Sequence, residues 1–305
     1  MQIYQQINRN KRNTFLFLFV FILLIIAVVY AVSYSLSPES AYIVATIAFL
    51  ISVVGSFFTY YYSDQMLLKM ANARPVSRER EPFLYHTIEG VAIASGVPTP
   101  KAYVIESDVP NAFATGRNPQ NSAVAVTRGL LKLMNREELE GVIAHEMAHI
   151  KNYDILFSTI VIVLAGTLVY VSAILRRAFF YGGARGGGRG RGGSKGNPIV
   201  MIVGIITIVL APLIAKLIQM AMSRSREYLA DATAARTIGY PLGLASALEK
   251  LANYSNPDRV EREGFANEAT AGLFIINPLS KNLNVDSVFS THPPIKKRIE
   301  VLRKM

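Results

Sequence analysis

Four stretches of the 305-residue chain contain no charged residue, and they constrain the fold more than any other feature. They cover residues 14–36, 41–62, 155–175 and 198–215. A helix needs about 20 apolar residues to cross the hydrocarbon core of a bilayer. The first two stretches therefore predict a transmembrane hairpin that turns at residues 37–40. The third and fourth predict a second hairpin, for which a re-entrant arrangement is the alternative to full spanning.

Basic residues flank the first hairpin on one side only. The turn has none, whereas several lie just outside the two stretches: Arg9, Lys11, Arg12, Lys69, Arg74, Arg78 and Arg80. Segments rich in Lys and Arg stay in the cytoplasm. The pattern predicts a multi-pass protein of the cell (plasma) membrane whose polar segments face the cytoplasm. The glycine- and arginine-rich segment 182–196 opposes this rule, because it lies outside if both later stretches span.

Composition narrows the possible chemistry. The chain has no cysteine, which excludes disulfides, thiolate metal sites and cysteine nucleophiles. The net charge of +11 suits contact with anionic lipid head groups and also with nucleic acid. Nucleic-acid binding through residues 182–196 is disfavoured, because no folded nucleic-acid module is evident beside that segment. We expect a mobile loop there, since it has no large apolar residue to bury.

The stretches divide the chain into four segments. These are an N-terminal hairpin (1–62), a first polar segment (63–154), a second hairpin (155–215) and a second polar segment (216–305). Periodicity, prolines and capping residues predict helices over 81–95, 135–152, 223–238 and 242–254 and after Pro294, and strands over 101–105, 111–114 and 123–126. The expected fold class is a mostly α membrane protein with four transmembrane helices and a cytoplasmic α+β domain with a small sheet.

The sequence His-Glu-Met-Ala-His at residues 145–149 carries the strongest chemical signal. On a helix, His145 and His149 lie on one face, where both imidazoles can bind one zinc ion. Glu146 beside them suits a general base that takes a proton from water. Incidental histidines are a weak alternative, because half of the chain's four histidines fall in this window. We expect one zinc ion per subunit.

A catalytic zinc site needs a third protein ligand. Glu227 is favoured over His86 and His292, because small alanines flank it and because the second hairpin returns its helix to the surface that carries the zinc motif. Asp231, one turn later, is placed to accept a hydrogen bond from the free ring nitrogen of a ligating histidine. An ordinary salt-bridged helix remains the alternative for this pair.

These residues together resemble the HtpX family of membrane-bound zinc metalloproteases. The resemblance adds Asn-Ala-Phe-Ala-Thr-Gly at 111–116 and Ser-Thr-His-Pro-Pro at 290–294, and it extends over nearly the whole chain. It implies a gluzincin-type zinc metallopeptidase domain with Glu227 as the third ligand. It also implies an endopeptidase that hydrolyses misfolded or unstructured membrane proteins in quality control and the stress response.

The resemblance implies roles for three further residues. Asn111 and Ala112 belong to an edge strand that binds the substrate main chain, and His292 donates to the oxyanion of the tetrahedral intermediate. The expected partners are polypeptide substrates and the lipid bilayer, and the oligomeric state is left open. One rival is a CAAX prenyl-type protease, which has more transmembrane helices. Another is a non-enzymatic zinc-binding membrane scaffold, which does not need Glu146.

Overall fold

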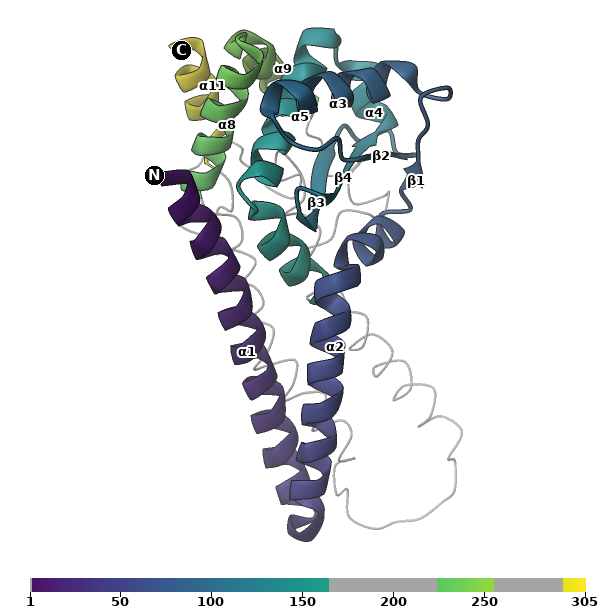
Figure 1. Cartoon of the computed structure of the whole chain (residues 1–305), viewed down its shortest axis with the longest axis vertical. Helices are drawn as coiled ribbons and strands as arrows, with labels where there is room; N and C mark the ends of the chain where they lie inside the picture. The colour runs from purple at the N-terminus through teal and green to yellow at the C-terminus, as the bar shows by residue number, and fades with distance from the viewer. Residues whose placement is uncertain (1, 165–223, 255–292) are drawn as a thin grey trace, which may run out of the picture.

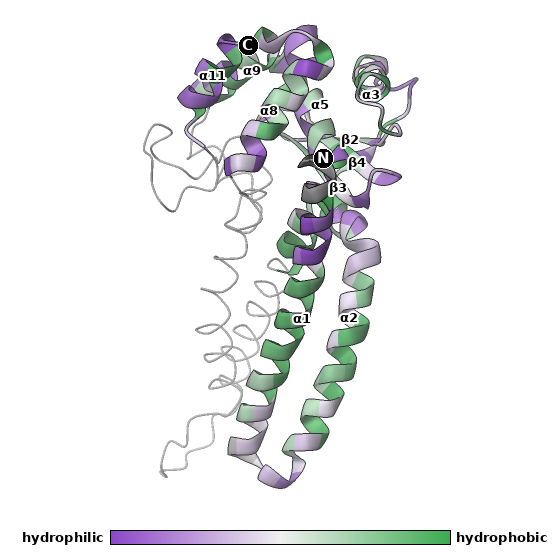
Figure 2. Ribbon diagram, turned by 60° about the vertical axis from the view of Figure 1, so that its left-hand side comes forward, coloured by the Kyte–Doolittle hydropathy of each residue, from purple (hydrophilic) through white to green (hydrophobic). Residues whose placement is uncertain are grey.

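The first predicted hairpin is present in the computed structural model, which describes residues 2–164, 224–254 and 293–305 (Figure 1). Helix α1 (Gln2–Leu36) and helix α2 (Ala41–Met70) run side by side and are joined by the short 3-10 helix Pro38–Ser40. Two segments, Ile7–Ala31 and Pro38–Met70, are long and apolar enough to cross a membrane. Their hydrophobic residues fill the middle of the hairpin in Figure 2.

A third helical segment, Asp154–Leu164, starts the third uncharged stretch. It follows helix α5 (Arg136–Lys151) after a bend of 89°. It packs against α1, where the ring of Phe157 meets that of Phe17 edge-on with centroids 5.9 Å apart. The rest of the third stretch, the segment 182–196 and the fourth stretch lie outside the described residues, so the second hairpin stays a prediction.

A small mixed sheet forms one layer of the domain at the end of the hairpin. Its strands are β1 (Arg74–Pro75), β2 (Lys101–Ile105), β3 (Ala112–Asn118) and β4 (Asn121–Thr127), in the order β1-β2-β4-β3. Only β2 and β4 are parallel. Strands β3 and β4 are longer than expected, because they pair with each other as a hairpin. Among the described residues, β3 is an edge strand.

Five of the expected helices are present: the first two contact the sheet, the other three pack behind them, and the bounds of all five agree with the expected ones to within a residue or two. They are α3 (Pro82–Ser95), α5, α8 (Arg224–Ile238), α9 (Pro241–Tyr254) and α11 (Ile295–Arg303). The short helix α4 (Arg128–Leu133) was not expected. Helix α5 starts at a capping box: Asn135 Oδ1 accepts from Glu138 N (2.9 Å), and Glu138 Oε2 accepts from Asn135 N (2.8 Å).

Helix α5 lies at the centre of the domain. It contacts α3, α8, α9 and β3, and it buries Leu139, Ile143, Met147 and Ile150. Gly141 lets α9 approach closely, because a Cβ there would lie 2.7 Å from the backbone nitrogen of Leu244. The helix that carries the zinc motif is therefore held from several sides.

Candidate active site

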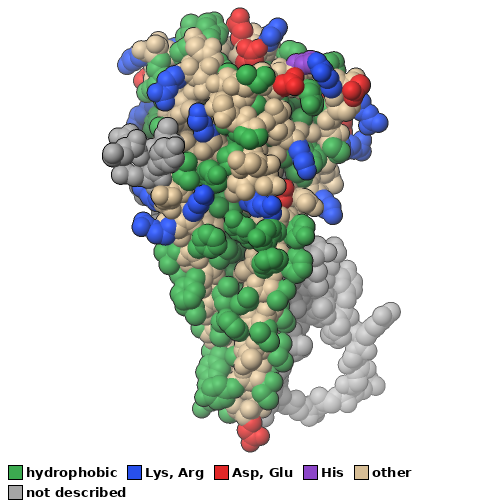
Figure 3. Space-filling view, viewed as in Figure 1, with side chains coloured by type: hydrophobic (Ala, Val, Ile, Leu, Met, Phe, Trp, Pro, Cys, Tyr) green, Lys and Arg blue, Asp and Glu red, His purple; other side chains and the backbone are tan. Residues whose placement is uncertain are grey.

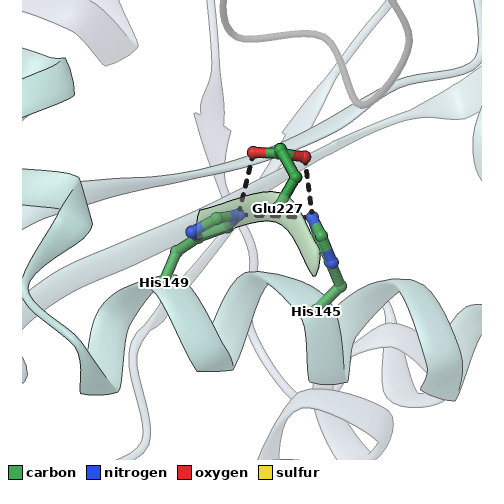
Figure 4. A group of neighbouring side chains, drawn as sticks. All are labelled: His145, His149 and Glu227. Atoms are coloured by element: carbon green, nitrogen blue, oxygen red, sulfur yellow. Dashed lines mark hydrogen bonds and ion pairs between the residues drawn. The ribbon is translucent and has the colours of Figure 1, made fainter. Parts of the chain in front are cut away.

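Two helices bring the predicted ligands together. His145 and His149 project from one face of α5, with their Nε2 atoms 3.2 Å apart. Glu227, in the first turn of α8, reaches across to both (Figure 4). Its Oε2 lies 3.6 Å from Nε2 of His145, and its Oε1 lies 3.6 Å from Nε2 of His149. Each residue offers one ligand atom within 4.8 Å of the others.

This donor set fits a zinc ion. Zinc–nitrogen bonds of 2.0–2.1 Å in tetrahedral geometry place two ligand nitrogens about 3.3 Å apart. The observed separation of the two Nε2 atoms, 3.2 Å, is close to that value. Two imidazoles and one carboxylate are also the donor set of a catalytic zinc site, which keeps its fourth position open.

A carboxylate lies behind each histidine. Asp231 Oδ1 is 3.0 Å from Nδ1 of His145, although the ring N–H does not point along a hydrogen-bond direction. Asp154 Oδ2 is 3.1 Å from Nδ1 of His149. Such carboxylates orient the rings and leave Nε2 to face the metal. Sequence reasoning had singled out Asp231 for this position, one helical turn after Glu227.

Arg298 is a buried part of the site that sequence reasoning missed. It lies on α11, is 1% exposed, and forms two hydrogen bonds of 2.8 and 2.7 Å to the carboxylate of Asp231. Its Nη1 is also 3.4 Å from Oε2 of Glu227. A signal was available, because Arg298 occupies the apolar face of its helix with Ile295, Ile299 and Leu302.

The site carries an excess of negative charge. Burial alone would lower the pKa of His145, but the nearby carboxylates of Asp231 and Glu227 outweigh it and raise the pKa to about 9. The described ionisable groups around the two histidines are Glu146, Asp154, Glu227, Asp231, Arg226 and Arg298. Counted as ionised, these four carboxylates and two guanidinium groups leave two negative charges, which one divalent cation balances.

Glu146 lies between the ligands and strand β3. Its side chain is buried, and burial raises its pKa, whereas the two histidines and a hydrogen bond from the backbone of Ala114 oppose the rise. Ala114 belongs to β3, so the predicted base touches the edge strand.

The predicted substrate-binding residues lie at the start of this strand. Asn111 directly precedes β3, and its backbone N donates a hydrogen bond to Oγ1 of Thr127 at 2.8 Å. Ala112 pairs with Val126 on β4, and His292 lies outside the described residues.

Comparisons with known proteins identify the family of the chain. Peptidase family M48 matches residues 78–305. A protein named "Protease HtpX homolog" from Dictyoglomus turgidum is 46% identical over 303 residues, which cover 99% of this chain and 94% of the relative. Its namesake from Streptococcus gordonii is 41% identical over 99% of this chain and 100% of the relative. The solved structure of S. mikatae Ste24p is 21% identical and covers 94% of this chain and 67% of that chain, with a TM-score of 0.48, which is too weak a likeness to add to these matches.

Proposed function

The chain belongs to peptidase family M48 and is a membrane metalloprotease, and from this premise we propose that it is a zinc-dependent endopeptidase of membrane protein quality control. Its substrates are peptide bonds in misfolded or unstructured membrane proteins. The observation that carries the proposal is the meeting of His145, His149 and Glu227 beside the buried Glu146 and an edge strand.

We assign His145, His149 and Glu227 as the ligands of one zinc ion per subunit. When bound, zinc supplies Lewis-acid chemistry, because it lowers the pKa of water and polarises a carbonyl. Glu146 accepts a proton from the attacking water and passes it to the leaving amine. Its pKa is raised by burial, which suits a carboxylate that must release a proton as well as take one.

The polypeptide substrate is proposed to lie along β3. Extended chains add to the free edge of a sheet through main-chain hydrogen bonds, which grip a substrate without selecting its sequence. Asn111 and Ala112, at the start of β3, are the proposed contacts, and the hydrogen bond from Ala114 to Glu146 supports a reacting group near that strand. His292 is proposed as the oxyanion donor from its motif alone.

We further propose that the protein spans the plasma membrane four times, with the active site at the cytoplasmic face. The hairpins 1–62 and 155–215 are the membrane parts, and segments 63–154 and 216–305 build the catalytic domain. The polar end of α1 and the end of α2 both meet the domain in Figure 1. Lys and Arg side chains gather over the domain and its junction with the hairpin in Figure 3, as expected of a cytoplasmic side.

The test is cleavage of an unfolded protein by the detergent-purified full chain with zinc. Glu146→Gln should lower kcat/KM by about 10²- to 10⁴-fold while zinc stays bound. The matched control is Glu137→Gln, an exposed glutamate on the same helix, which should cleave at the normal rate.

Unchanged cleavage by Glu146→Gln would contradict the mechanism. Zinc bound without cleavage of any unfolded protein would point to the scaffold alternative. Cleavage confined to a prenylated peptide would point to the CAAX prenyl-type alternative.

A further inference from the structure

The polar end of membrane helix α1 holds the break between α5 and the helix Asp154–Leu164. Asn10 Nδ2 donates to the backbone oxygen of Asn152 (3.0 Å) and to Oδ1 of Asp154 (2.7 Å). Lys11 places its Nζ 4.4 Å from the centroid of the Tyr153 ring. Three consecutive residues at the break are therefore held by two consecutive residues of α1.

The position of this break determines where His149 lies. His149 is in the last turn of α5, which ends at Lys151 and has Asn152 as its C-cap. Tyr153 then takes a left-handed backbone conformation, with φ of 59°. A residue other than glycine keeps this backbone conformation only where the surrounding structure stabilises it. Asn10 supplies part of that hold, because it satisfies a carbonyl at the helix end that lacks a partner within the helix.

Asn10 also acts on the carboxylate behind His149. Asp154 uses one oxygen, Oδ1, to accept from Asn10 and the other, Oδ2, to contact Nδ1 of His149. An amide NH₂ can only donate, so this bond fixes which oxygen is left for the histidine. With Nδ1 engaged by a carboxylate, Nε2 of His149 is available as a metal ligand.

A third contact links Asn10 to the helix of the remaining ligand. Its Oδ1 lies 3.5 Å from Nη1 of Arg226, which neighbours Glu227 on α8 and is 3.8 Å from Oδ1 of Asp154. Asn10 is only 5% exposed, although it lies near the start of the candidate membrane span Ile7–Ala31. A buried amide is costly unless it is hydrogen-bonded, and here its partners come from the break, Asp154 and α8.

We propose that Asn10 is a positioning residue of the catalytic centre: through Asp154 it sets the orientation of His149, so that the first membrane helix completes the metal site. This inference rests on the proposed function, since it takes His149 as a zinc ligand. It predicts that metal affinity depends on a residue outside the catalytic domain.

The first test measures zinc retention by the full-length protein in detergent, in competition with a chelator. Substitution of a carboxylate that supports a ligating histidine weakens metal binding about 10- to 100-fold. Asn10→Ala acts one contact further out, so we expect the zinc dissociation constant to rise about 3- to 10-fold. Asn8→Ala is the matched control, because Asn8 is exposed on the same helix and should leave retention unchanged.

Exchanging the amide and the carboxylate between residues 10 and 154 separates a positioning role from general destabilisation of the fold. Asn10→Asp keeps the shape of the side chain but sets a carboxylate against that of Asp154, so zinc retention should fall more than in Asn10→Ala. Adding Asp154→Asn restores the hydrogen bond between positions 10 and 154 with donor and acceptor exchanged. The new amide NH₂ at position 154 donates to the carboxylate at position 10, and the amide oxygen still accepts from His149. The double variant should retain zinc better than Asn10→Asp alone.

The results separate this inference from the proposed function. If the unmodified protein binds zinc and cleaves, but both Asn10 variants retain zinc as well as Asn8→Ala does, the inference is wrong and the function stands. A double variant with simply additive losses also overturns it. An unmodified protein that binds no zinc overturns the proposed function and the inference together.

Discussion

The packing of α9 on α5 can be tested with glycine-to-alanine substitutions, which should change the free energy of unfolding in opposite directions at two positions. At Gly141 a methyl group would lie 2.7 Å from the backbone nitrogen and 2.9 Å from Cα of Leu244. These are backbone atoms of α9, which cannot move aside as a side-chain tip can. At Gly90, which is exposed on α3, a Cβ meets nothing within 4 Å.

The magnitudes follow from two opposing terms. Alanine in the middle of a helix is favoured over glycine by about 0.5–1 kcal/mol. Forcing an extra methyl group into a packed interface costs about 1–3 kcal/mol, and backbone contacts belong at the upper end. Gly90→Ala should therefore stabilise the fold by about 0.5–1 kcal/mol. Gly141→Ala should destabilise it by about 2 kcal/mol, a fall of about 4–8 °C in Tm for a domain of this size.

Thermal unfolding of the zinc-loaded protein in detergent is the assay. The chain has no tryptophan, so circular dichroism is the suitable signal. Gly141 is also one helical turn before His145, so its variant should lose part of its cleavage rate. A rise in Tm for both glycine variants would refute the argument that α9 packs against α5 through Gly141.

Three further results are expected. Arg298→Met should lower stability by about 3–5 kcal/mol, because it leaves the buried carboxylate of Asp231 without its cation, and adding Asp231→Asn should recover part of the loss in Tm. Glu138 is buried, yet hydrogen bonds from Lys250, Ser246 and the Asn135 backbone hold its pKa below the usual 4.5. The ionised carboxylate therefore stabilises the fold above pH 4.5, and this stabilisation is lost as the pH falls through the lower pKa of the folded state. The difference in Tm between the unmodified protein and Glu138→Gln should shrink in acid. Removing the metal with a chelator should abolish cleavage and lower Tm. The expected loss in the free energy of unfolding is about 2.7 kcal/mol relative to zinc at 100 times its dissociation constant, and added zinc should restore both cleavage and Tm.

Local sequence patterns were sufficient to predict the structural features that depend on residues close together in the sequence. The apolar stretches predicted the α1–α2 hairpin, and the capping residues predicted the start of α5 at Asn135. Strand β2 has the expected bounds, because flanking prolines mark it. The extension of β3 to Asn118 was missed, because Gly116, Arg117 and Asn118 become a strand only by pairing with β4. Gly116 itself, with φ of 140°, has no room for a side chain against Asn121.

The same distinction explains which parts of the site were found. The His145–His149 spacing is local, and so is the spacing of Glu227 and Asp231, so helical periodicity reveals both pairs. Arg298 is 67 residues from Asp231, and Asn10 is 144 residues from Asp154. No periodicity connects partners that far apart. These partners come from α1 and α11, so the carboxylates behind both histidines have these hydrogen-bond donors only when α1 meets the break after α5 and α11 packs on α8. A protein missing either helix should therefore still contain all three proposed ligands and yet bind zinc weakly.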